Sequence, residues 1–326
     1  MSARLRVSLL VAALAALAAV VVAAAAVLSA EELPPREQKG EQARPRKGVP
    51  DLILDLGVRD DAEARDLRRA AQLYESGRLG EAARLFERHD SLEAKLGAAF
   101  AAWPASLDRV EQLGALYPRS ALAQLHVGLA RFWAGEGDAI TAWREAQDVE
   151  PDTPYAVRAN DLLHPEFAPG LPIFVPAAPF PAGLELQRPA RQLEVLRQGA
   201  EDVSFDGPAG LDSKLLYGTA LQRLGRPLSA QRVYDEAVRG FPNDPEALAA
   251  AAVGRYTKER PAVAFSRLGP LTRRFPRAAT VRFHLGLLLL WQRDVAEAKR
   301  QLRLAVAAEP GSRLAREAQR YLAALP

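Results

Sequence analysis

Three prolines divide the C-terminal third of the chain at a constant interval. Pro242, Pro276 and Pro310 are spaced 34 residues apart. A fixed period of this length is typical of a solenoid, in which one supersecondary unit is repeated and stacked. Proline lacks an amide hydrogen and its ring clashes with the preceding helical turn, so each of these prolines predicts the end of a helix. The chain is therefore expected to fold as a stack of short helical repeats.

Small and large residues recur at fixed places between these prolines. When each proline is numbered 32 within its repeat, positions 8 and 20 hold only glycine or alanine, and position 24 holds a large side chain. Small residues on two facing helices let the backbones approach closely, and a large side chain fills the space beside them. This pattern predicts two antiparallel helices in each repeat. The residues are Gly218, Ala252 and Gly286 at position 8, Ala230, Ala264 and Ala298 at position 20, and Tyr234, Leu268 and Leu302 at position 24.

This pattern resembles the tetratricopeptide repeat family over residues 211–312. The family usually carries an aromatic residue at position 4, where this chain has Lys214, Leu248 and Arg282. A weaker copy of the pattern lies upstream at Ala70–Arg88. Alanine and arginine are abundant and alternating runs of Val, Ile and Thr are scarce, which also favours helices. We expect an all-α protein, an α-solenoid of antiparallel helix pairs behind an N-terminal hydrophobic helix.

The N-terminal sequence predicts export or membrane anchoring. An apolar, uncharged run at 7–30 follows Arg4 and Arg6, and about 20 such residues span a bilayer as a helix. We assign 1–30 as a membrane anchor or a cleaved signal peptide. Residues 31–50 hold almost no apolar side chains, so they are expected to form a flexible linker.

The charges around the hydrophobic run bear on its orientation. Basic residues before the run favour a cytoplasmic N-terminus. The bulk of the chain would then lie outside the cytoplasm, anchored to the membrane, or secreted if the segment is cleaved. The basic residues within the predicted linker favour the opposite orientation. A cytoplasm-facing protein on the same anchor therefore stays open as an alternative.

A proline-rich insert at 164–188 separates two runs of repeats, at 51–163 and at 189–326, and the second run ends in a capping helix at 312–325. A loop this long without secondary structure is usually functional or disordered, and a disordered segment rarely carries many large apolar residues. We expect the insert to pack on the protein, across its concave face, with a plain spacer as the alternative. The large apolar residues are Phe167, Ile173, Phe174, Val175 and Phe180.

The sequence holds no recognisable catalytic motif. It has no cysteine, which excludes thiol catalysis, disulfides and cysteine-type zinc sites. Its four histidines do not have the spacing of paired metal ligands, and no phosphate-binding loop or nucleophile elbow occurs. His284 lies in a leucine-rich run and is expected to be packed. We therefore predict that the protein is not an enzyme and has no cofactor or metal.

The resemblance implies a position for a ligand. In the family, ligands lie along the concave face lined by the first helix of each repeat. The corresponding positions here are mostly apolar and lack the Lys, Arg and Asn with which some members grip a terminal carboxylate. We expect a hydrophobic or extended segment there, from a partner protein or from the insert itself. The predicted partner-binding residues are Leu215, Thr219, Gln222, Ala249, Val253, Tyr256, Phe283, Leu287 and Leu290.

These features predict a non-catalytic scaffold for protein–protein interaction, tethered to the membrane. One alternative is a cytoplasm-facing membrane adaptor. Another is an envelope enzyme or sugar-binding protein in which the proline-rich insert forms a cleft. The sequence does not identify the partner.

The C-terminal third is strongly basic. Residues 255–320 hold fifteen Lys or Arg and five Asp or Glu, whereas the net charge of the whole chain is +3. This asymmetry indicates either a solvated basic face or a surface for an acidic partner or an anionic membrane. Aromatic residues are not interleaved with the basic ones as base stacking needs, so nucleic acid is not expected.

Overall fold

The computed structural model describes residues 45–202 and 208–326. The predicted hydrophobic helix at 1–30 and most of the predicted linker lie outside these residues. The described part contains fifteen α-helices, one short 3-10 helix and no strand, which confirms the all-α prediction. None of the helices described is long and apolar enough to cross a membrane.

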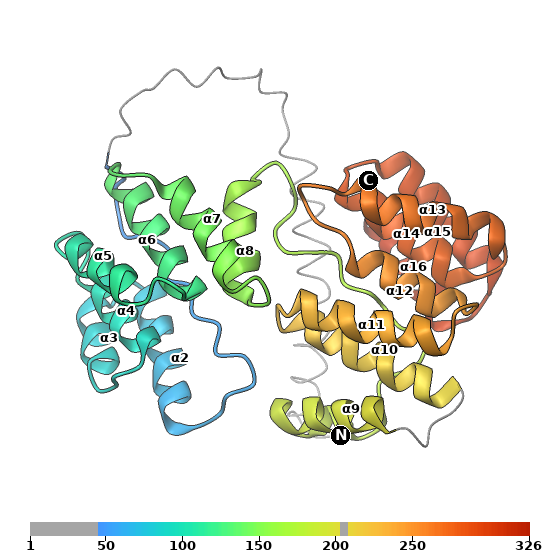
Figure 1. The fold of residues 1–326 in the computed structure, drawn as a ribbon, viewed down its shortest axis with the longest axis horizontal. Coiled ribbons are helices and arrows are strands. Elements are labelled where there is room, and N and C mark those ends of the chain that lie inside the picture. The colour runs from blue at the N-terminus through green and yellow to red at the C-terminus, as the bar shows by residue number, and fades with distance from the viewer. Residues whose placement is uncertain (1–44, 203–207) are drawn as a thin grey trace, which may run out of the picture.

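The helices form two groups that lie side by side (Figure 1). The first group, the N-terminal unit, consists of three antiparallel helix pairs and a closing helix. Its helices are α2 (Ala62–Glu75), α3 (Leu79–Phe86), α4 (Leu92–Ala101), α5 (Leu107–Leu116), α6 (Ala121–Ala134), α7 (Ala139–Val149) and α8 (Pro154–Leu163).

The C-terminal unit repeats this plan behind one additional helix. After α8, an extended chain runs to the second group and reaches α9 through the 3-10 helix (Figure 1). Three helix pairs follow, closed by α16. The elements are η1 (Leu184–Leu186), α9 (Pro189–Glu201), α10 (Pro208–Arg223), α11 (Pro227–Gly240), α12 (Pro245–Gly254), α13 (Ala262–Arg274), α14 (Ala279–Trp291), α15 (Val295–Ala308) and α16 (Arg313–Ala324).

Local side chains determine where these helices begin and end. Asp61 and Ser312 each cap a helix by accepting a hydrogen bond from the backbone N–H three residues on. Such a cap satisfies one of the N–H groups that a helix start leaves without an intrahelical partner. At the other end, α11, α13 and α15 each stop two residues before a periodic proline. The proline spacing therefore predicted the ends of the second helices correctly.

The close packing expected from the repeat pattern is also present. A Cβ added at Gly218, at position 8, would lie 2.3 Å from the ring of Tyr234, at position 24. In the N-terminal unit, a Cβ at Gly128 would lie 2.3 Å from the indole of Trp143. Carbon atoms cannot approach so closely, so each aromatic ring occupies the space that the glycine leaves open.

The two units are joined by polar contacts between α8 or its preceding turn and the C-terminal unit. Asp152 accepts hydrogen bonds from the backbone N–H groups of Leu228 and Ser229, at 2.8 and 3.0 Å, and so caps α11. Asp161 on α8 forms an ion pair of 2.6 Å with Lys258, whose side chain is fully buried. These contacts hold α8 against the start of the second solenoid.

The end of the predicted linker is packed, which corrects the expectation that 31–50 is free throughout. The Arg46 N–H donates to the carbonyl of Trp133 at 2.8 Å, and the Arg46 guanidinium lies 3.8 Å from the centre of the Phe132 ring. The physical reason is the aromatic surface at the end of α6, which attracts a cation to the face of its ring.

Candidate functional site

The nine predicted partner-binding residues lie on one face of the C-terminal unit, which we call the first-helix face. It is formed by α10, α12 and α14, which contact one another in that order. Tyr256 lies just beyond α12, because that helix ends at Gly254. Seven of the nine residues are buried, and Gln222 and Leu290 are half-buried. The face is covered, in large part by the proline-rich insert.

The insert crosses the first-helix face as an extended segment at 171–178, which we call the C-terminal strap. Its central residue, Phe174, is fully buried and belongs to the core of the C-terminal unit. The Phe174 ring stacks on His284, with centroids 4.3 Å apart, and meets Tyr234 edge-on at 5.7 Å. The insert therefore packs across the face, as its apolar residues predicted.

Side chains of α10 bind the backbone of the strap. Gln222 accepts the N–H of Phe174 at 2.8 Å and donates to the carbonyl of Pro172 at 3.4 Å. The Thr219 hydroxyl lies 3.2 Å from the carbonyl of Phe174 and 2.9 Å from that of Leu215, so these two acceptors share its one proton. The Tyr234 hydroxyl donates to Gln222 at 2.9 Å and orients its amide. These bonds recognise an extended backbone and place no demand on the side chains of the strap.

Charged side chains bind the end of the strap. Glu246 on α12 accepts the N–H of Ala177 at 2.5 Å. Arg313 on α16 donates through Nη1 to the carbonyls of Pro176 and Ala178. Burial, together with nearby carboxylates, raises the pKa of Glu246 to about 7. Ionisation of Glu246 beneath the strap therefore carries an energetic cost, which the hydrogen bond from the Ala177 N–H partly offsets.

His284 connects the strap to α14. Its Nδ1 lies 2.7 Å from the carbonyl of Thr280, and its Nε2 lies 3.0 Å from the backbone nitrogen of Val175. A carbonyl only accepts and an amide only donates, so the ring is neutral with its proton on Nδ1. Burial lowers the pKa of His284 to about 4, which keeps Nε2 available as an acceptor.

The N-terminal unit contains a second strap, at 50–55, that the sequence reasoning missed. The N–H of Ile53 donates to Nε2 of His126 at 3.2 Å, and Nδ1 of His126 lies 2.8 Å from the carbonyl of Leu122. Burial lowers the pKa of His126 to about 4 as well. The neutral tautomer and the geometry thus match those of the first histidine.

Two tyrosines bind the ends of this N-terminal strap. The Tyr74 hydroxyl donates to the carbonyl of Pro50 at 2.6 Å. The Tyr155 hydroxyl donates to the carbonyl of Asp55 at 2.9 Å. The hydroxyl oxygen of Tyr155 in turn accepts the N–H of Asp55 at 3.2 Å. Both straps therefore run from the first helix pair of their unit toward its closing helix.

The two units share one arrangement of a buried histidine and an extended strap. Each holds a buried histidine on the first helix of its third pair, and each histidine binds a strap that precedes the unit in the chain. The signal in the sequence is a short repeated motif, His-Val-Gly-Leu at 126–129 and His-Leu-Gly-Leu at 284–287. This motif could have predicted that the two histidines occupy equivalent positions, but it does not indicate which segments bind them.

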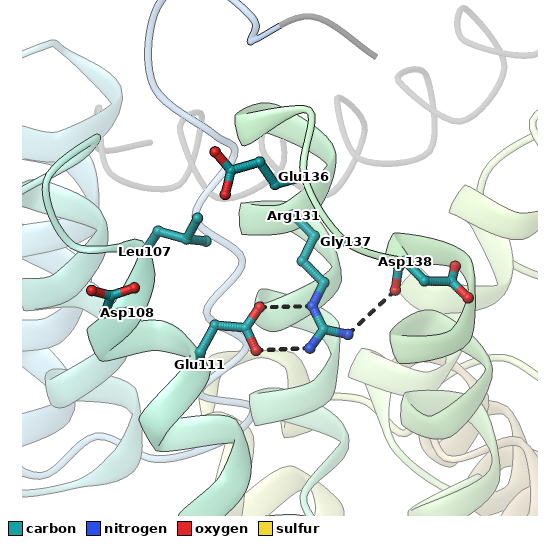
Figure 2. A pocket seen from close by; sticks show the side chains of 7 residues that line it. All are labelled: Leu107, Asp108, Glu111, Arg131, Glu136, Gly137 and Asp138. Carbon is teal, nitrogen blue, oxygen red and sulfur yellow. Dashed lines mark hydrogen bonds and ion pairs between the residues drawn. The ribbon is translucent and has the colours of Figure 1, made fainter. Parts of the chain in front are cut away.

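A shallow hollow of about 400 Å³ lies between α5, α6 and the turn before α7 (Figure 2). Arg131 points into it and donates to both carboxylate oxygens of Glu111, each at 2.7 Å, and to the carbonyl of Asp138 at 3.4 Å. The guanidinium charge is therefore already neutralised. Asp108 and Glu136 add negative charge to the lining. We assign no ligand to this hollow.

Six of the basic residues of the C-terminal third lie on the second helices α13 and α15 and in the turn after α13. Some are paired within their own helix, as Arg300 is with Glu297 at 2.6 Å. Of these six, Arg273, Arg274, Arg277, Arg300 and Arg303 are exposed, and Lys299 is half-buried.

Comparison with known families identifies one of these repeats. The tetratricopeptide repeat family model matches residues 211–253, from α10 to α12. Residues 211–253 are therefore similar to a tetratricopeptide repeat, as the residue pattern of this part predicted. Repeats of this family generally mediate protein–protein interaction. No curated protein gives a significant match to the chain.

Proposed function

We propose that the protein is a non-catalytic, membrane-tethered scaffold that binds an extended apolar segment of a partner protein on its first-helix face. One observation carries this proposal. The face already holds an extended segment, the C-terminal strap, through backbone hydrogen bonds and one buried aromatic side chain. A partner segment of the same shape would satisfy the same groups.

The contacts indicate what such a segment would contain. Backbone bonds to Thr219, Gln222 and His284 give affinity without sequence preference, as in other modes of extended-peptide recognition. The enclosed position of Phe174 gives specificity for an aromatic side chain. The strap is the built-in competitor, and a tethered competitor acts at an effective concentration in the millimolar range. The partner must therefore be locally concentrated, which a membrane tether would provide.

The tether and the compartment are part of the proposal. The apolar run at 7–30 and the basic residues before it support an anchor with the bulk of the chain outside the cytoplasm. The exposed basic surface of the C-terminal third would then face acidic partners or anionic lipid headgroups.

The test separates the strap from its face. The variant replaces 171–178 with an equally long Gly-Ser segment, and the probe is a labelled peptide with the strap sequence. Fluorescence anisotropy should show saturable binding to the variant and none to the unmodified protein. A peptide carrying Phe174→Ala should bind at least about tenfold more weakly, since burial of a Phe side chain contributes about 1.5–3 kcal/mol. A folded variant that ignores the peptide would contradict the proposal.

Partner capture is tested in the native membrane with a photo-crosslinking residue at Leu287, on the first-helix face. The matched control places it at Leu304, an exposed position on α15. A partner should be captured at Leu287 only, and more efficiently when the strap is replaced. Equal capture at both positions would place the interaction elsewhere.

A further inference from the structure

A cavity of about 240 Å³ lies beside the C-terminal strap, where the two units and the insert meet. It is bounded by Pro176 of the strap, Phe180 just after it, α9, α10 and the start of α16, and the turn residue Val58 closes it from the N-terminal unit. Cavities at such junctions are common ligand sites. Most of its wall is apolar, through Pro176, Phe180, Leu193, Leu196, Leu216 and Leu224.

Two arginines contribute the charge of this cavity. Arg223, at the end of α10, and Arg313, at the start of α16, both line it. Among the described residues, no carboxylate forms an ion pair with either of them. Burial lowers the pKa of Arg313, and the charge of Arg223 lowers it further, whereas Glu317 and Glu246 act in the opposite direction without forming an ion pair with it. Both hydrogen bonds from Arg313 to the strap use Nη1.

We propose that this cavity binds an amphipathic carboxylate, with its apolar body against the leucines and its carboxylate between Arg223 and Arg313. The two positively charged guanidinium groups repel each other beside an apolar wall, and a single bound anion between them would offset this repulsion. Guanidinium groups also match the planar geometry of a carboxylate. A neutral hydrocarbon would leave the arginines unmatched, and an inorganic anion would leave the apolar wall empty.

Two sources could supply this chemistry, a free fatty acid or the C-terminal residue of an apolar peptide. The proposal does not depend on partner binding at the first-helix face, because the cavity lies beside the strap and is present while the strap is docked. A bound ligand would touch Pro176 and Phe180 of the insert and Val58 of the N-terminal unit. It would therefore stabilise the docked insert.

The experiment is calorimetric titration of the unmodified protein with octanoate, octanol, acetate and N-acetyl-leucine. We expect octanoate or N-acetyl-leucine to bind with one site per chain. Octanol, which loses the charge-assisted hydrogen bonds, and acetate, which loses the apolar contacts, should each bind at least about tenfold more weakly. Stronger binding of octanoate would identify a fatty acid, and stronger binding of N-acetyl-leucine would identify a peptide terminus. Equal binding of octanol and octanoate would overturn the proposal.

Two variants locate the site. Arg223→Gln should weaken the preferred carboxylate about tenfold or more and leave octanol unchanged, since it removes one charge contact. The matched control is Arg226→Gln, at an exposed arginine that does not line the cavity. Leu193→Trp fills the cavity from α9 and should abolish binding of every apolar ligand. Equal effects of the two arginine variants, or unchanged binding in Leu193→Trp with its helicity intact, would place the ligand elsewhere.

Discussion

Phe174 and His284 lie with their rings 4.3 Å apart and nearly parallel, at an interplanar angle of 13°. One ring comes from the strap and the other from α14. The same histidine accepts the backbone N–H of Val175 at 3.0 Å. It therefore binds a side chain and a backbone group of the strap together, and determines where the insert lies on the C-terminal unit.

Removing the Phe174 side chain should release the strap. We expect Phe174→Ala to lower the free energy of unfolding of the C-terminal unit by about 3–5 kcal/mol, the usual cost of truncating a buried phenylalanine. Urea unfolding followed by circular dichroism measures this. Limited proteolysis should also cut the insert faster. The matched control is Ile173→Ala, because Ile173 is the exposed neighbour at 36% and its loss should change stability by less than about 1 kcal/mol.

A small effect of Phe174→Ala on both measurements would mean that the backbone bonds alone hold the strap. In that case the aromatic residue would not be the source of specificity proposed for this face.

The two buried histidines should make the protein less stable in acid. Burial depresses the pKa of His126 and of His284 to about 4 in the folded state, against an ordinary value of about 6.5. Between these values the unfolded chain binds more protons, so stability falls as the pH is lowered from about 6.5 to about 4. The double variant His126→Gln and His284→Gln should be less stable at pH 7 and show a shallower loss over this window.

The control for this prediction is His89→Gln, at a partly exposed histidine that hydrogen-bonds Asp66 at 3.0 Å. The loss of stability that the two buried histidines cause between about pH 6.5 and about pH 4 should remain in this variant. If the double variant also keeps the full acid dependence, other groups are responsible for it.

The repeat architecture could be predicted because its determinants are local and periodic. The Gly218–Tyr234 contact joins positions within one repeat, and helix ends at prolines need only the neighbouring turn. The first-helix face followed from the same register, so the nine site residues were brought together on one side of the unit. The burial of these nine residues could not be predicted in this way. The repeat register determines the direction of a side chain, but it does not say which segment covers that side chain.

The straps could not be paired with their histidines from the sequence. Val175 and His284 belong to segments that share no period, and a backbone N–H carries no sequence signal. The N-terminal strap was harder still, because 50–55 reads as the end of a linker and the beginning of a repeat. Recognition of an extended chain through its backbone leaves little trace in residue identity.

Ionisation of Glu246 should lower the stability of the folded protein as the pH rises. Burial raises its pKa to about 7 in the folded state, above its ordinary value of about 4.3. The folded protein therefore binds more protons between these values, and this contribution to stability is lost as the pH rises through about 7.

Glu246→Gln keeps an acceptor for the Ala177 N–H without the charge. Its melting temperature relative to the unmodified protein should increase between pH 5 and pH 8, whereas Glu236→Gln, at an exposed position on α11, should show no such trend. A constant difference across this range would show that Glu246 does not titrate there.

The ion pair between Lys258 and Asp161 should couple the unfolding of the two units. The atoms are 2.6 Å apart, and the side chains are 0% and 9% exposed. Lys258→Met leaves the carboxylate of Asp161 with Arg158, at 3.6 Å, as its remaining ionic partner among the described residues, and should cost up to about 3–5 kcal/mol. We expect scanning calorimetry to resolve two transitions in place of one. Adding Asp161→Asn removes the stranded charge and keeps an acceptor for the N–H of Gly170, which donates to Asp161 at 2.8 Å. The double variant should therefore recover most of the lost stability, because replacing both partners of a buried pair is often close to neutral.

As a control, Arg78→Gln breaks an exposed pair with Glu81 and should change stability by at most about 1 kcal/mol. A single, unshifted transition in Lys258→Met would show that the other contacts between the units, such as those of Asp152 with α11 and of Gln147 with Glu259, hold them together without the ion pair.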